Sequence, residues 1–115
     1  MLSVNLHLRN GLVLDKHGNK LYYFNNELHR TDGPALEYSN GHKEWFQYGK
    51  LHRTDGPAIE WAEGTKEWRQ NGLVHRTDGP AIEYSNGVKA WYLEGKELTE
   101  EQFNSQSYRE FTKYM

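Results

Sequence analysis

Hydrophobic and polar residues alternate along this chain in short runs that glycine, asparagine and aspartate interrupt every few residues. At the start of the chain, apolar residues occupy every second position: Leu2, Val4, Leu6 and Leu8. A two-residue period is typical of a strand with one buried face. The Asn10-Gly11 pair that follows is a strong hairpin-turn signal. The pattern therefore predicts capping strands in residues 1–17.

The alternation then repeats with a fixed period. The string LHRTDGPALEY starts at Leu28, LHRTDGPAIEW at Leu51 and VHRTDGPAIEY at Val74, so successive copies start 23 residues apart. Four further columns keep this period: Gly18, Gly41, Gly64, Gly87; Lys20, Lys43, Lys66, Lys89; Tyr22, Trp45, Trp68, Trp91; and Asn26, Gly49, Gly72, Gly95. Periods of about 20–50 residues are typical of stacked repeats, and atypical end copies serve as caps.

Within one copy, PAIEYSNGVKAWYLEG predicts two short strands around a turn. A two-residue turn would need positive φ at Glu63, which glutamate resists, and would set Glu60 opposite Glu67. A three-residue turn instead places Gly64 in the left-handed conformation and pairs opposite charges. We therefore predict the cross-strand pairs Glu37–Lys43, Glu60–Lys66 and Glu83–Lys89.

The repeated HRTDGPA string is predicted to connect one hairpin to the next, because Asp-Gly-Pro favours a turn and proline suits the first position of a strand. Its polar residues are His29, Arg30, Asp32, His52, Arg53, Asp55, His75, Arg76 and Asp78. Equivalent residues of successive hairpins should lie about 9.6 Å apart, two strands at roughly 4.8 Å each, whereas metal ligands lie about 2 Å from one ion. We therefore expect structural roles: each Asp caps its own turn, each Arg pairs with a nearby acid, and each His packs at the connector.

The C-terminal segment LTEEQFNSQSYREFTKYM predicts a helix over 98–115. Thr99 and Gln102 form a capping box, and Phe103, Phe111 and Tyr114 fall on one face. A helix of about 16 residues is only about 24 Å long. It is too short to cover a sheet of eight or nine strands, roughly 40 Å across. Aromatic surface near Trp61 or Trp68 should therefore stay exposed.

The 115 residues suffice for one domain, with hairpin repeats over 18–97 between the two end segments. There is no cysteine, which excludes a disulfide scaffold and a cysteine nucleophile and fits a cytoplasmic protein. The net charge of −2 argues against nucleic acid as a partner. We predict no signal peptide, no membrane span and no membrane partner. No catalytic motif, cofactor site or metal site is recognisable, so an enzyme is not expected.

From Gly18 to Glu97, the glycine-rich, Trp-bearing hairpins, with NG(K/L)xH after the second strand, resemble the MORN (membrane occupation and recognition nexus) repeat. The HRTDGPA connector is similar to a variant that is frequent in tailed bacteriophages and large DNA viruses. The resemblance implies a mainly β fold, an elongated, twisted antiparallel sheet of stacked hairpins, here followed by the C-terminal α-helix. It also implies a viral source and hence the cytoplasm of a host cell.

The leading functional hypothesis is a non-enzymatic protein-interaction module. The resemblance suggests a phage accessory or anti-defence protein that binds and inhibits a host protein. Two alternatives remain: a small-ligand or nucleotide sponge that uses the aromatic columns, and a structural scaffold that self-associates as a homo-oligomer. The candidate interaction residues are Trp45, Trp61, Trp68, Arg69, Trp91 and His42.

Overall fold

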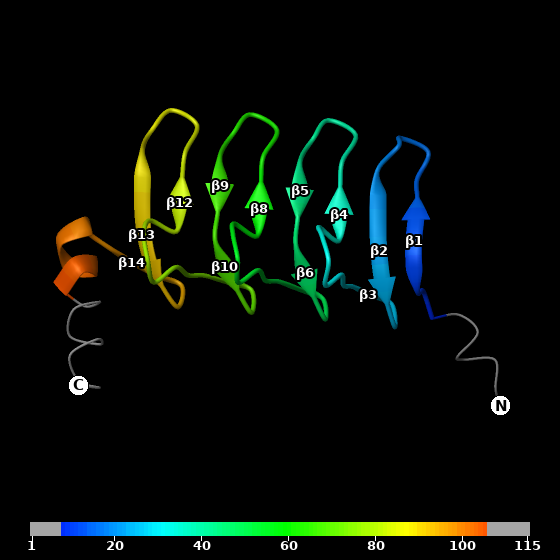
Figure 1. The fold of residues 1–115 in the computed structure, drawn as a ribbon, viewed down its shortest axis with the longest axis horizontal. Helices are drawn as coiled ribbons and strands as arrows, with labels where there is room; N and C mark the ends of the chain where they lie inside the picture. Colours follow the sequence, from blue (N-terminus) through cyan, green and yellow to red (C-terminus); the bar gives the residue numbers. More distant parts are fainter. Residues whose placement is uncertain (1–7, 106–115) are drawn as a thin grey trace.

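The computed structural model describes residues 8–105, which form a row of β-hairpins with a short helix at one end (Figure 1). The strands are β1 (Gly11–Leu14), β2 (Lys20–Phe24), β3 (Glu27–Leu28), β4 (Leu36–Glu37), β5 (Lys43–Glu44), β6 (Phe46–Gln47), β7 (Lys50–Leu51), β8 (Ile59–Glu60), β9 (Lys66–Glu67), β10 (Arg69–Gln70), β11 (Leu73–Val74), β12 (Ile82–Glu83), β13 (Lys89–Leu93) and β14 (Lys96–Leu98). The fold is mainly β, as the sequence predicts.

One antiparallel sheet of ten strands runs through the molecule. Its order is β1-β2-β4-β5-β8-β9-β12-β13-β14, and β3 pairs with β2. Two small ladders, β6-β7 and β10-β11, extend the middle hairpins at their lower ends. The hairpins lie side by side along the longest dimension of a molecule that measures 54 × 35 × 20 Å (Figure 1). The expected elongated sheet of stacked hairpins is confirmed.

The three-residue turn is also confirmed. Trp61 and Thr65 close the turn through a backbone hydrogen bond of 2.9 Å, and Gly64 has a φ of +108°. The predicted pairs Glu37–Lys43, Glu60–Lys66 and Glu83–Lys89 are all found in the ladders. Because the register is the same in every copy, equivalent side chains face the same side of the sheet.

A second turn in each copy lies at the opposite end of the hairpin, where the column of one Asn and three Gly residues predicts the left-handed conformation that is found. Two successive residues there have positive φ, as a type I′ turn requires; the pairs are Asn25-Asn26, Tyr48-Gly49, Asn71-Gly72 and Glu94-Gly95. The column of Asn26, Gly49, Gly72 and Gly95 is the signal for these turns in the sequence. Tyr48 adopts a φ of +48°, which is uncommon for an aromatic residue.

The Asn10-Gly11 pair does not form the predicted hairpin turn. Instead, the backbone oxygen of Arg9 accepts a hydrogen bond of 3.0 Å from Asn26 N, and Asn10 Oδ1 accepts one of 2.9 Å from Asn25 N. The chain therefore continues alongside the turn between β2 and β3, because that turn offers unpaired N–H groups. Most of the predicted strand through Leu2–Leu8 lies outside the described residues.

The helix begins as predicted. Thr99 N donates to Gln102 Oε1 and Gln102 N donates to Thr99 Oγ1, both at 3.0 Å, so the capping box forms. The helix is described over residues 100–105, beside the last hairpin, and Phe103 is buried there. The predicted partners Phe111 and Tyr114 lie outside the described residues.

The core is thin and lies within the sheet. Its central members are Ala35, Ala58 and Ala81, one in each copy, all 0% exposed. Leu36 and Ile59 are buried beside them. Such a core buries little apolar area. Much of the stability must therefore come from contacts that side chains make with their neighbours on the same face of the sheet.

Candidate functional site

The sheet has two faces that differ in chemistry. Successive residues of a strand point to opposite faces, so Lys43 and Trp45 share one face while His42 and Glu44 share the other. We call the first the connector face, because the HRTDGPA arginines pack there against the Tyr22, Trp45 and Trp68 rings. We call the second the open face.

On the connector face, each connector arginine is held by four contacts. In the middle copy, Arg53 Nε donates to Asp55 Oδ1 at 2.9 Å. Its Nη1 donates to Pro57 O at 3.0 Å and to Glu60 Oε2 at 3.3 Å. The guanidinium carbon lies 4.0 Å from the centroid of the Trp45 ring, as in a cation–π contact. Arg53 thereby joins its own connector to two neighbouring strands.

The same contacts recur in the other two copies. Arg30 and Arg76 lie 3.9 Å from the ring centroids of Tyr22 and Trp68, respectively. Their acidic partners are Asp32 and Glu37 in one copy, and Asp78 and Glu83 in the other. The expected pairing of each connector arginine with an acid is confirmed, and each arginine pairs with two.

Two expectations about the acids need correction. The connector Asp does not act by capping its own turn: its carboxylate accepts from the arginine two residues earlier. This hydrogen bond and the charge of Arg53 lower the pKa of the Asp55 carboxyl below its ordinary value. The Glu that faces a lysine in the ladder, such as Glu60 opposite Lys66, forms its ion pair with the connector arginine. The reason is that the side chain of Arg53 extends over the connector face and brings its Nη1 to within 3.3 Å of Glu60 Oε2.

The glycine of Asp-Gly-Pro is explained by this packing. A Cβ built on Gly56 would lie 2.8 Å from Arg53 Cζ, and Gly33 and Gly79 show the same close approach to Arg30 and Arg76. The guanidinium is therefore packed between an aromatic ring and a glycine backbone. Any side chain at this position would displace it.

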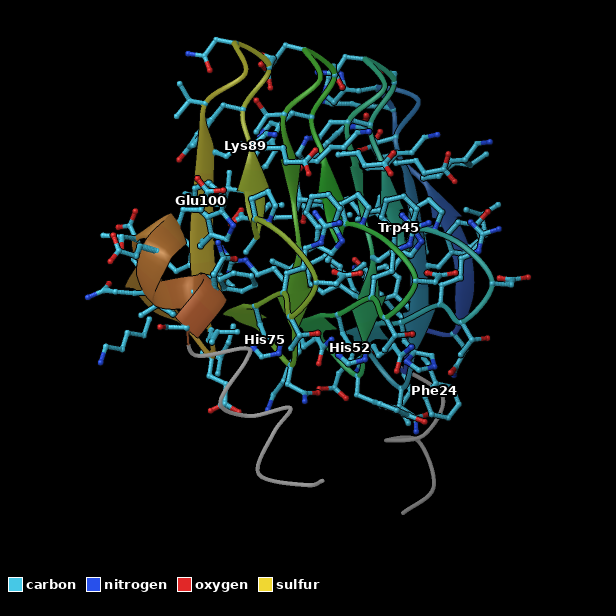
Figure 2. The ribbon with its side chains drawn as sticks, turned by 60° about the vertical axis from the view of Figure 1, so that its left-hand side comes forward. Phe24, Trp45, His52, His75, Lys89 and Glu100 are labelled. Carbon is cyan, nitrogen blue, oxygen red and sulfur yellow. The ribbon has the colours of Figure 1, made fainter. Side chains whose placement is uncertain are left out.

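The connector histidines link neighbouring repeats. His52 Nδ1 accepts a hydrogen bond of 3.0 Å from Asn71 N, a residue with positive φ in the turn of the next hairpin. His29 and His75 accept equivalent bonds from Tyr48 N and Glu94 N, at 2.9 Å and 2.8 Å. Figure 2 shows His52 and His75 at the same height on successive repeats. The expected packing role of these histidines is confirmed, and it includes a specific hydrogen bond.

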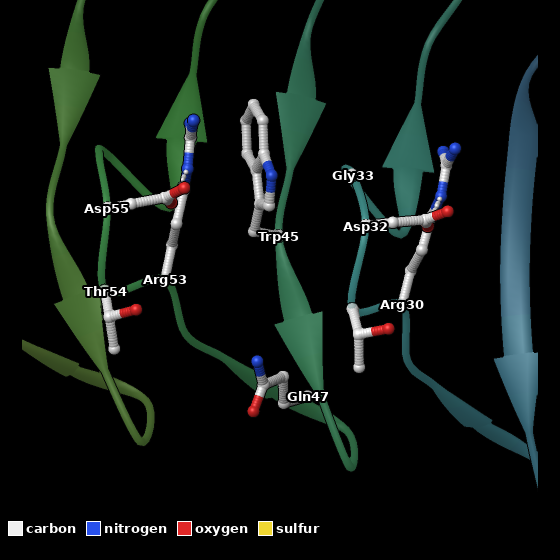
Figure 3. Close-up of a pocket in the computed structure, with 9 residues that line it drawn as sticks. Arg30, Asp32, Gly33, Trp45, Gln47, Arg53, Thr54 and Asp55 are labelled. Atoms are coloured by element: carbon white, nitrogen blue, oxygen red, sulfur yellow. Dashed lines mark hydrogen bonds and ion pairs between the residues drawn. The ribbon is translucent and has the colours of Figure 1, made fainter.

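Grooves separate successive connectors on this face (Figure 3). The first has a volume of about 450 Å³, and Trp45 lies in it between Arg53 on one side and Asp32 on the other. The second, of about 520 Å³, repeats this arrangement around Trp68. Each connector arginine binds two carboxylates and a carbonyl oxygen through Nε and Nη1, while the Asp32 and Asp55 side chains remain 83% and 84% exposed. The lining therefore offers a ligand the exposed Asp32 and Asp55 carboxylates, the exposed Thr54 hydroxyl and the half-buried Gln47 amide.

The open face carries a row of side chains next to the three-residue turns. In order across the sheet, the row consists of Tyr38, His42, Trp61, Thr65, Tyr84 and Val88. Tyr38, Trp61 and Tyr84 are 42%, 36% and 43% exposed, and Val88 is 55% exposed. Large apolar side chains thus lie uncovered on three successive hairpins, over the part of the chain that the structure describes.

Two slots between the aromatic side chains of this row differ in what fills them. In the first, the His42 ring lies between Tyr38 and Trp61, with centroid distances of 5.2 Å and 5.7 Å. In the second, between Trp61 and Tyr84, Thr65 stands at the equivalent position, and an open, shallow depression of about 320 Å³ remains. We call them the histidine slot and the open slot.

Carboxylates line the open slot. Glu67 is buried, and its Oε1 accepts from Arg69 Nη2 at 2.9 Å. Glu63 accepts hydrogen bonds from Ser85 Oγ and Thr65 N. The bond from Ser85, followed by those from Thr65, lowers the pKa of the Glu63 carboxyl below its ordinary value. Glu63 is therefore ionised at neutral pH.

The six candidate interaction residues fall on both faces. His42, Trp61 and Arg69 belong to the open face; Trp45 and Trp68 lie under connector arginines, and Trp91 shares their column. The expected exposed aromatic surface is found at Trp61, whereas Arg76 stacks on Trp68. Sequence reasoning missed Thr65 and Glu67. The signal that could have found them is the change from His42 to Thr65. The two copies otherwise keep aromatic and acidic residues at the surrounding positions.

Within residues 8–105, no helix has the length and apolar character needed to cross a membrane. Over the same part of the chain, no three side chains of His, Asp or Glu gather as metal ligands do. No family model, no curated protein and no solved structure matches this chain.

Proposed function

We propose that this protein is a non-enzymatic protein-interaction module that binds a partner protein on its open face. The observation that carries the proposal is the row of exposed aromatic side chains at Tyr38, Trp61 and Tyr84. Aligned, uncovered apolar side chains on a small protein usually mark an interaction site. Tryptophan and tyrosine also supply most of the binding energy in many protein interfaces.

The contrast with the connector face supports this choice. There the aromatic rings are covered by arginines, whose Nε and Nη1 groups bind acids and a carbonyl oxygen of the chain itself. If these arginine groups bound a ligand instead, the contacts that join one repeat to the next would be lost. The open-face side chains make fewer such contacts, so a partner can use them without unfolding the sheet.

The partner class follows from the resemblance to MORN-like repeats of phages and large DNA viruses. A host protein that the chain binds and inhibits is the first partner to test. A second copy of the chain is the alternative occupant of the same face, and the grooves of the connector face are the alternative site for a small ligand.

Affinity capture from an extract of the natural host tests the proposal. Wild type should retain a specific host protein, Trp61→Ala should lose it while staying folded, and Thr54→Ala, in the groove of the connector face, should retain it. Loss of capture with Thr54→Ala and retention with Trp61→Ala would contradict the proposal. Light scattering on the same three proteins identifies self-association, and thermal stabilisation by added nucleotides identifies a ligand sponge.

A further inference from the structure

The histidine slot shows what chemistry fits between two aromatic side chains of the open face. His42 is buried there, and its Nε2 lies 2.7 Å from Glu44 Oε2. A flat ring with an N–H group thus occupies the space between Tyr38 and Trp61 and contacts a carboxylate at the floor. The chain itself supplies this occupant.

The open slot has the corresponding aromatic and acidic residues without the histidine, and it has Glu63 where the histidine slot has Asn40. Trp61 and Tyr84 correspond to Tyr38 and Trp61 one repeat earlier, and Glu67 corresponds to Glu44. Thr65 is too small to fill the position of His42, and the open depression of about 320 Å³ that Trp61 and Tyr84 both line is left as a result. The histidine slot therefore indicates what kind of group would fit in the open slot.

The charge of the open slot favours a cation. Both hydrogen bonds from the Arg69 Nε and Nη2 atoms end on Oε1 of Glu67, at 3.3 Å and 2.9 Å. The other oxygen, Oε2, has no hydrogen-bond partner among the described residues. Glu63 adds a second carboxylate to the lining. Two negative groups against one arginine leave an excess of one negative charge at the slot.

We propose that the open slot binds the side chain of an arginine from the partner protein, with its guanidinium between Trp61 and Tyr84 and its N–H groups directed at Glu67 and Glu63. The His42 ring is tilted by 41° to Tyr38 and meets Trp61 edge-on, so the slot accepts a flat group without requiring parallel stacking. A guanidinium is flat and packs on aromatic rings better than the compact ammonium of lysine. It also carries several N–H donors for two carboxylates. The inference rests on the proposed function only in assigning the arginine to a partner protein.

The test uses the whole chain and a small probe, so that it does not depend on finding the partner. Nα-acetyl-argininamide is titrated into the protein, and the Trp61 indole N–H signal is followed by NMR. Nα-acetyl-citrullinamide has nearly the same shape without the charge, and Nα-acetyl-lysinamide has the charge without the flat group. We expect the arginine probe to bind about tenfold more tightly than either of the other two. Equal binding of the arginine and citrulline probes would overturn the proposal.

Variants that exchange the residues at the equivalent positions 42 and 65 test the site further. Thr65→His should place an imidazole in the open slot, as in the preceding repeat, and abolish binding of the arginine probe. His42→Thr combined with Asn40→Glu, the counterpart of Glu63, should open the histidine slot and give a second site for the probe. If Thr65→His does not fold, the number of sites in the His42→Thr, Asn40→Glu double variant decides, and an unchanged single site overturns the proposal. Binding of the probe without capture of any host protein would contradict the proposed function alone.

Discussion

The two faces of this sheet are built from the same strands, yet they repeat to different degrees. On the connector face, the arginine, its two acids and the glycine beneath it recur in all three copies with nearly the same distances. On the open face, His42 gives way to Thr65, and Phe46 to Arg69, at equivalent positions. Positions that join one hairpin to the next must solve the same geometric problem each time, whereas positions that face outward are free to differ.

This difference separates two uses of tryptophan. Trp45 and Trp68 have guanidinium groups stacked on their rings, and they connect strands to connectors. Trp61 contacts His42 edge-on and is otherwise at the surface. A repeat protein can thus place the same residue type on both faces, where one copy contributes to stability and the other is available for binding.

The largest expected effect is the difference between these two tryptophans. Trp68→Ala should lower the free energy of unfolding by about 3 kcal/mol, because the ring and its contact with Arg76 are both lost. Trp61→Ala should lower it by about 1 kcal/mol or less, because the ring is partly exposed. Urea denaturation of both variants measures this. Equal losses would mean that the open face is part of the core.

Gly56→Ala tests the packing of the connector arginine. The added Cβ would lie 2.8 Å from Arg53 Cζ, so the guanidinium must leave the Trp45 ring, at a cost of about 2 kcal/mol. If this is the mechanism, Arg53→Ala and the double variant Arg53→Ala with Gly56→Ala should have similar stabilities. Additive losses in a denaturation cycle would show that Gly56 matters for another reason.

The turn decides which residues share a face, because a shift of one residue would exchange the two faces. Gly64→Ala should cost about 1 kcal/mol, since its φ of +108° suits only glycine. Asn86→Ala should cost less than half of that, because Asn86 has a negative φ and contributes one exposed hydrogen bond to Val88 N. Similar costs in thermal unfolding would point to a two-residue turn and a different assignment of the faces.

The smallest effect concerns acid. Hydrogen bonding to Arg53 lowers the folded-state pKa of Asp55, so its contribution to stability is present above the ordinary value of 3.8 and is lost as the pH falls through the lower folded value. Asp55→Asn should therefore lose less stability than wild type between pH 5 and pH 3, by urea midpoints at each pH. Glu63→Gln on the open-face side should flatten the profile in the same direction, since its pKa is lowered too. A steeper acid loss in either variant would contradict these hydrogen bonds.

Much of the fold follows from the sequence alone. The 23-residue period, the glycine columns and the alternation of charge predict the stacked hairpins and their register, because these are local properties of turns and adjacent strands. The capping box at Thr99 and Gln102 is local in the same sense. The Asn10-Gly11 turn was predicted by the same local rule and is wrong, because Arg9 and Asn10 instead form hydrogen bonds with the neighbouring turn at Asn25 and Asn26.

The roles of the repeated motif and the candidate site depend on the tertiary structure. Arg53 reaches Trp45, eight positions earlier in the chain, and His52 reaches Asn71 in the next hairpin. No local rule relates these residues, because the side chains meet only after successive hairpins have stacked. The open slot also depends on the tertiary structure. The sequence shows Thr65 in place of His42, but the open depression exists only because the stacked hairpins bring Trp61 and Tyr84 to its two sides.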